Sequence, residues 1–269
     1  LFKKMNQVSR SWLRMAGFAL PALPLNSLVV IVFVFLPPLY ADHQGLGTAA
    51  VGGIFLIAKL FDIIAAPIWG TVMDNYKTPW GRRRPWLVLA VPILMTSVYM
   101  VSNPPESAGT LYLLIWLTTL YIGWDAWTIS HTSWALELSG DYDRRSRITG
   151  LLQFMVMLGG ILVSTIPAVM ERLSSPSYEE KVSSIALWML AVLPLSVLIC
   201  LFSVREHDVP PQPHLGFRRG ISVLIHNMAL VRLLVANALL TFSTYFVQGL
   251  FVFFVTYTLG LENWVGLLL

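Results

Sequence analysis

The chain has 269 residues, of which 56% are hydrophobic and only 12% are charged. A soluble domain carries about a quarter charged residues, so this composition, with a mean hydropathy of +0.69, excludes an ordinary soluble domain and indicates an integral membrane protein. The formal net charge is +4, but the basic residues gather in a few short loops, which argues against a nucleic-acid partner. Cys200 is the only cysteine and lies in an apolar segment, so we interpret it as a small core residue.

Seven apolar segments are long enough to cross a bilayer, which takes about 20 residues per helix. They lie at 16–41, 48–73, 85–103, 109–137, 149–170, 183–203 and 229–259, and an eighth begins after Glu262. The predicted fold is therefore an all-α polytopic membrane protein. Membrane helices tolerate prolines, which often mark kinks, and four lie inside these spans: Pro37, Pro67, Pro167 and Pro194.

The basic residues alternate with the spans. Fifteen of the eighteen Lys and Arg residues precede span one, lie between spans two and three or four and five, or lie between span six and the first turn of span seven. The positive-inside rule therefore places the N-terminus and the loop after span six in the cytoplasm.

The longest break in the apolar pattern, from Val204 to Asn227, is rich in proline, which favours an extended segment. We predict an N-terminal bundle of six transmembrane helices at 1–203 and a cytoplasmic linker at 204–228. At 229–269 we expect the first helix of a second bundle and the start of the next, with that bundle incomplete.

Ionisable residues deep in a membrane cost at least about 2.5 kcal/mol each and are functional candidates. Three lie at mid-membrane depth within predicted spans: Lys59, Asp62 and Asp125. Lys59 and Asp62 are three residues apart, so they share a helix face and can pair. Either this pair neutralises itself against the neighbouring bundle, or it lines a ligand or ion pathway; the sequence favours the pathway.

Asp125 belongs to a polar stripe in span four. Tyr121, Thr128 and Thr132 fall four residues before it and three and seven residues after it, on one helix face. Such a stripe on an apolar helix is typical of a face that lines a cavity.

Three further polar residues each leave two interpretations open. Trp127 either stacks its indole face on a sugar or packs as an ordinary membrane tryptophan. His131 is either a proton relay or a hydrogen-bonded interior residue. Asn26, beside Ser27 in span one, either bridges helices or meets a polar ligand.

The loop "GTVMDNYKTPWGRRRPW" is the most specific motif. Its arginines can cap helix ends and pair with an aspartate, which would hold one conformation of a moving bundle; the alternative is that the charges only fix the orientation in the membrane. The candidate gating residues are Gly70, Asp74, Gly81, Arg82, Arg83 and Arg84.

These stretches resemble the major facilitator superfamily, whose signature between spans two and three is Gly-x-x-x-Asp followed by Gly-Arg-Arg. More narrowly, "AKLFDIIAAPIWG", "PWGRRRPW" and "YIGWDAW" resemble the glycoside–pentoside–hexuronide cation symporters, the melibiose permease-like family. The turn also looks like that of the sucrose–proton symporters. The resemblance covers nearly all of the chain and somewhat over half of a twelve-span member.

The resemblance implies two six-helix bundles that enclose a central sugar site and rock to give alternating access, in a bacterial inner membrane. By position it implies that Asp62 and Asp125 are cation-site carboxylates. Lys59 falls where melibiose permease has an arginine, and Asn26 falls where it has a sugar-binding aspartate. We therefore expect substrate binding by Asn26, Lys59, Asp125, Trp127 and Thr128, and proton or cation coupling by Asp62 and Asp125.

Departures from the family pattern argue against sodium. Ala66 replaces a cation-binding aspartate, Ile122 replaces a threonine that helps to coordinate the ion, and Ile129 replaces a sugar-contacting tryptophan. A sodium ion needs several oxygen ligands, whereas a single buried carboxylate can exchange a proton. We therefore expect a transporter that is proton-coupled or uncoupled.

Two functions remain open. The first is a secondary-active transporter of a sugar or glycoside. The second is a non-transporting accessory or structural subunit that associates with a larger membrane complex. No nucleophile motif or metal-spaced His/Cys cluster is apparent, so an enzyme, a metal site or a cofactor is not expected.

Overall fold

The computed structural model describes residues 12–76, 78–138, 140–173, 176–204, 206, 222–223, 225–253 and 259. The chain divides into two compact units, Leu1–Val209 and Pro210–Leu269, and each is described by itself. The described residues form helices and their short connections, with one isolated bridge between Thr78 and Gly81. The predicted all-α architecture is confirmed.

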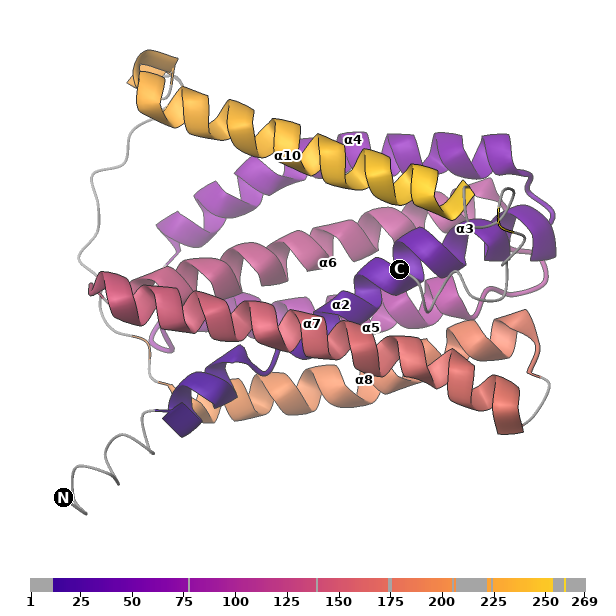
Figure 1. Cartoon of the computed structure of the whole chain (residues 1–269), viewed down its shortest axis with the longest axis horizontal. Coiled ribbons are helices and arrows are strands. Elements are labelled where there is room, and N and C mark those ends of the chain that lie inside the picture. Colours follow the sequence, from indigo (N-terminus) through magenta and orange to yellow (C-terminus); the bar gives the residue numbers. More distant parts are fainter. Residues whose placement is uncertain are drawn as a thin grey trace. The chain divides into compact units, whose positions relative to one another are not determined.

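Long helices make up the described part of the first unit (Figure 1). A first helical stretch, Trp12–His43, precedes five single helices. These five are α4 (Thr48–Asn75), α5 (Arg84–Ser102), α6 (Thr110–Glu137), α7 (Tyr142–Leu173) and α8 (Tyr178–Ser203). The second unit contains α10 (Met228–Phe253). Each of the seven predicted spans therefore contains a long helix among its described residues, and the predicted eighth lies outside the described residues.

Five of the described helices are long and apolar enough to cross a membrane: Trp12–His43, α4, α5, α7 and α8. Helix α6 has 28 residues, so it is also long enough. It is not among the five, because the polar and aromatic residues around Asp125 lower its hydropathy. Helix α6, which carries Asp125, is therefore less apolar than the other long helices described in the first unit.

The first helical stretch departs from α-geometry around its two adjacent prolines, Pro37 and Pro38. After helical residues 12–19 and a turn at 20–21, it continues as α2 (Ala22–Val30), the π-helical segment η1 (Ile31–Phe35), α3 (Leu36–Pro38) and a second π-helical segment, η2 (Leu39–His43). Proline has no backbone N–H to donate, so the regular hydrogen-bond register cannot continue through it. The kink predicted at Pro37 takes this π-helical form.

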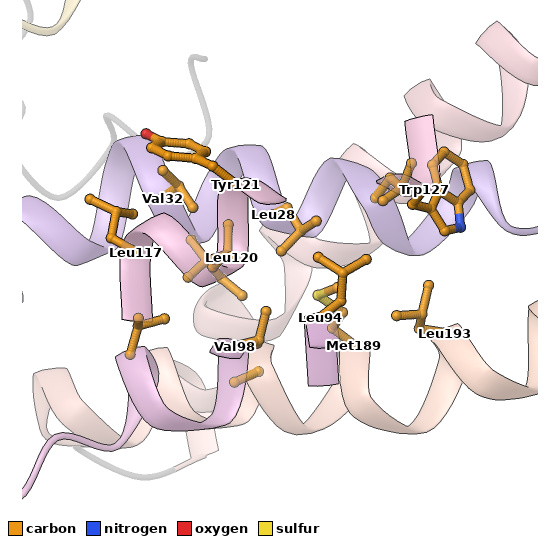
Figure 2. Close-up of a cluster of buried hydrophobic side chains, with 14 of the residues drawn as sticks. Leu28, Val32, Leu94, Val98, Leu117, Leu120, Tyr121, Trp127, Met189 and Leu193 are labelled. Carbon is orange, nitrogen blue, oxygen red and sulfur yellow. The ribbon is translucent and has the colours of Figure 1, made fainter. Parts of the chain in front are cut away.

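Helix α6 packs against both α4 and α5, while α2 packs on α7 and α5 packs on α8. Figure 2 shows the buried core that these helices share, with Leu28, Leu94, Leu120 and Met189 among its residues. Cys200 belongs to the same core, as predicted. Because α6 lies against α4, the polar stripe of span four meets the Lys59–Asp62 face of span two.

The predicted domain boundaries remain a prediction. The linker predicted at 204–228 lies largely outside the described residues.

Candidate functional site

Lys59 and Asp62 form an ion pair on α4. Their Nζ and Oδ2 atoms lie 2.6 Å apart, and the Asp62 side chain is 8% exposed while that of Lys59 is 53% exposed. The ammonium group also lies 4.7 Å from the centre of the Tyr121 ring, which belongs to α6. A cation over an aromatic face is attracted to the ring, so Lys59 joins the two helices at this level.

Asp125 on α6 completes this group, because it lies close enough to interact electrostatically with both Asp62 and Lys59. One lysine therefore faces two aspartates, and one negative charge is left uncompensated. Each carboxyl group also keeps one buried oxygen without a hydrogen-bond partner in the described chain, Oδ1 of Asp62 and Oδ2 of Asp125. Buried oxygens of this kind are costly unless a proton, a cation or a donor reaches them.

No group of three or more His, Cys, Asp or Glu residues suited to a metal ion occurs among the described residues. Ala66 lies one turn from Asp62 on α4 and offers no oxygen, and Ile122 offers none on α6. Neither position therefore adds a side-chain oxygen to the two carboxylates.

Exposure changes along the polar stripe of α6: Tyr121 is buried, Asp125 and Thr128 are half-buried and Thr132 is exposed. The Thr128 hydroxyl has no hydrogen-bond partner in the described chain. The Thr132 hydroxyl donates to the Thr128 carbonyl oxygen at 2.5 Å. Thr118 also has a buried, unpartnered hydroxyl. It lies seven residues before Asp125, hence on the same face, a spacing that could have identified it from the sequence.

Trp127 and His131 lie inside the bundle. Trp127 is 2% exposed and sits in the core shown in Figure 2, with its ring 4.6 Å from that of His131. Nε2 of His131 bonds to the Phe18 carbonyl oxygen at 2.9 Å, and the two side-chain rings stack. Because a carbonyl only accepts, this nitrogen carries the proton, and the geometry is that of a hydrogen-bonded interior histidine. Sugar stacking by Trp127 remains a prediction.

Asn26 on α2 is partly exposed and makes no hydrogen bond to the described residues. Its amide lies against α7, where a Cβ atom added to Gly160 would meet it. Asn26 therefore contacts a second helix through packing, and its hydrogen-bonding capacity stays unused.

The arginine turn, residues 78–84, is held by a network of charges. Arg83 is buried and donates to Asp74 at 2.8 Å and to Glu137 at 3.0 Å. Arg82 donates to the same Glu137 oxygen at 2.5 Å. The end of α4, the turn and the end of α6 are thereby tied together.

Glu206 binds the turn from beyond the end of α8. One of its oxygens accepts the backbone N–H groups of Arg82 and Arg83 at 2.7 and 2.8 Å, and the other accepts that of Arg84 at 3.3 Å. These donors stand at the N-terminus of α5, where the helix dipole favours an anion. Gly81 has a φ of +123°, and a Cβ atom there would clash with the Glu206 carboxylate, so glycine is required.

Arg84 caps the end of α8. It donates to the carbonyl oxygens of Leu201 and Val204 at 2.7 and 2.5 Å, and its guanidinium lies 5.5 Å from the centre of the Trp134 ring. Arginine near a helix C-terminus satisfies carbonyls that have no partner within the helix. Gly70, by contrast, has open space around it, so its gating role stays a prediction without a packing reason.

Sequence reasoning missed Glu137 and Glu206. Both lie just inside or beyond a helix end, in "WALELS" and "VREHDV", and each carries a negative charge among residues predicted on the basic side of the membrane. An acidic residue on a strongly basic side is a signal for an arginine partner, although the sequence does not say which arginine.

The family model described as MFS/sugar transport protein matches residues 17–269. The isoprimeverose transporter of Lactiplantibacillus pentosus is 32% identical over 160 residues, which cover 58% of this chain and 33% of that protein. The glucuronide carrier protein homolog of Escherichia coli strain K12 is 26% identical over 95% of this chain and 57% of its own length. The human sodium-dependent lysophosphatidylcholine symporter 1 is 20% identical over 78% of this chain and 45% of its length. The chain thus spans between a third and about three-fifths of these relatives.

Proposed function

Because this chain belongs to the MFS/sugar transport protein family, we propose that it forms part of a transporter of a neutral sugar or glycoside, coupled to protons. It is a multi-pass integral membrane protein. We further propose a bacterial inner membrane with a cytoplasmic N-terminus, which the alternation of basic residues supports.

The observation that carries the coupling proposal is the group formed by Lys59, Asp62 and Asp125. Its two carboxyl groups interact electrostatically, and one lysine compensates only one of them. A single proton would neutralise the group, and neutralisation removes the cost of a charge in the bilayer. We assign the proton to this carboxylate pair and the sugar hydroxyl groups to Asn26, Asp125 and Thr128.

The charge of the same group supports a neutral substrate. Lys59 is bonded to Asp62, so it is not free to pair with a carboxylate on a sugar. Until the proton binds, the group keeps one net negative charge, which disfavours the entry of an anionic glucuronide. The relatives are named for isoprimeverose, glucuronide and lysophosphatidylcholine, so family membership alone leaves the substrate open; the charge argument counts only against the anionic glucuronide.

Uptake by the full-length protein in proteoliposomes tests the proposal, with isoprimeverose and a glucuronide as the two probes. We expect uptake of isoprimeverose when the lumen is alkaline, loss of that uptake with a protonophore, and no stimulation by a sodium gradient. Stimulation by sodium alone would refute proton coupling, and preference for the glucuronide would refute the charge argument. Absence of uptake under every gradient would favour the accessory-subunit alternative.

A variant assigns the coupling residues. Asp62→Asn keeps the shape of the side chain and removes its charge, so we expect uptake that no longer responds to the pH gradient. Glu106→Gln is the control, because Glu106 lies on the exposed loop before α6, outside both the Lys59–Asp62–Asp125 group and the arginine turn. Proton-driven uptake that survives in Asp62→Asn would remove Asp62 from this role.

A further inference from the structure

Two adjacent glycines of α7 meet α2 in different ways. A Cβ atom added to Gly159 would run into the backbone of Leu23, including its carbonyl oxygen, so Gly159 permits a close approach of two helix backbones. A Cβ atom added to Gly160 would meet only the side-chain amide of Asn26. The absence of a side chain at 160 therefore makes room for the Asn26 side chain, and the close approach of the two helices does not depend on it.

That side chain is the amide without hydrogen bonds. Asn26 is partly exposed, and none of the described residues donates to it or accepts from it. An amide has two donors and a carbonyl acceptor, and leaving them unused at membrane depth is unfavourable. If Asn26 only filled space between α2 and α7, an apolar residue at 26 facing an alanine at 160 would pack equally well and would avoid the cost of unpaired polar groups.

The depth of Asn26 follows from contacts at both ends of two antiparallel helices. Phe18 of the first helix stacks on His131 of α6 near one end. At the other end, Tyr40 of the first helix and Tyr112 of α6 both donate to carbonyl oxygens in the last turn of α5.

An α-helix rises about 1.5 Å per residue, so the residue count between these contacts gives the approximate depth, even though the first helix includes a turn and π-helical segments. Asn26 lies about a third of the way between them on the first helix, and Asp125 lies about a third of the way on α6. The unpartnered amide and the carboxylate group therefore belong to one level of the bundle.

We propose that Gly160 is a positioning residue: its lack of a side chain sets the place of the Asn26 amide, and so sets the affinity for the sugar. This inference rests on the proposed transport function. A side chain at 160 pushes the amide away from α7 and displaces its donors from the sugar hydroxyl group. The nearest obstruction is the end of a flexible side chain, so the fold accommodates the change.

The matched pair Gly160→Ala and Gly159→Ala tests the proposal in full-length protein. For Gly160→Ala we expect the KM for isoprimeverose uptake to rise about five- to tenfold, as for the loss of one hydrogen bond, with the maximal rate and the melting temperature unchanged. Gly159→Ala lowers the melting temperature, because two helix backbones must separate. In an Asn26→Ala background, Gly160→Ala adds no further increase in KM.

Each contrary result has its own meaning. If the unsubstituted protein neither binds nor transports the sugar probes, the proposed function and this inference both fail. If it transports isoprimeverose but Gly160→Ala leaves KM unchanged, only the positioning role is overturned. A rise in KM that is the same with and without the Asn26 amide, or a loss of melting temperature equal to that of Gly159→Ala, also overturns it.

Discussion

The arginine turn and the carboxylate group are both rich in charge, yet they use it in opposite ways. At the turn, three arginine side chains and three consecutive backbone N–H groups find acceptors in Asp74, Glu137, Glu206 and the last carbonyls of α8. Among the buried donors of these arginines, only Nε of Arg84 has no hydrogen-bond partner in the described chain. In the group of Lys59, Asp62 and Asp125, the two aspartates share one lysine, and each keeps a buried oxygen without a hydrogen-bond partner in the described chain. A saturated network stabilises a conformation, whereas an unsaturated one is reserved for what the protein binds.

The largest effect on stability is expected at the turn, from Arg83→Ala. Its guanidinium is buried and joins Asp74 to Glu137, and removing one member of a buried charge group leaves the others without compensation. We expect a loss of about 3 kcal/mol in the free energy of unfolding, measured by denaturation in detergent. Arg144→Ala, at an exposed position, is the control and should change little. Equal stability of the two variants would show that the turn does not hold the bundle.

For Asp125→Asn, in the group of Lys59, Asp62 and Asp125, we expect the reverse of a structural defect: stability is kept while uptake is lost. Neutralising one of two neighbouring carboxylates relieves their repulsion, so the melting temperature should hold or rise. Uptake of isoprimeverose should fall about a hundredfold, since both a proton site and a sugar contact are altered. Uptake and melting temperature measured on the same preparation separate the two effects. A variant that loses both would place Asp125 with the structural charges.

Glu206→Gln should weaken the turn by about 1–2 kcal/mol, because an amide offers one acceptor oxygen and no charge to the N-terminus of α5. Thermal denaturation measures the loss, with Glu106→Gln as a control on an exposed loop. If the two variants melt together, the carboxylate of Glu206 contributes nothing to the turn.

The helices were predictable from the sequence because long apolar runs in a membrane protein have few alternatives to helix. The pairing of Lys59 with Asp62 was predictable too, since three residues along a helix bring side chains to one face. The partners of the arginines were not, because Glu137 and Glu206 lie 54 and 123 residues from Arg83, and spacing fixes only local neighbours. Nor does periodicity separate a core face from a cavity face, which is why the burial of Trp127 had to come from the structure.

The smallest effect is expected at the start of α8, at the end of that helix opposite Glu206. There the Ser177 side chain accepts from the Glu180 N–H at 3.2 Å, and the Glu180 side chain accepts from the Ser177 N–H at 2.9 Å, a capping box on an exposed helix end. Ser177→Ala removes half of the box and should cost about 1 kcal/mol in the free energy of unfolding. Ser184→Ala, whose hydroxyl donates only to the carbonyl four residues before it, is the control and should cost almost nothing. The loss should be smaller than for Glu206→Gln, because the Ser177 hydroxyl is neutral and accepts one N–H group, whereas the Glu206 carboxylate is charged and accepts three. A larger loss for Ser177→Ala would show that the capping box stabilises the protein more than the contacts of Glu206 with the arginine turn.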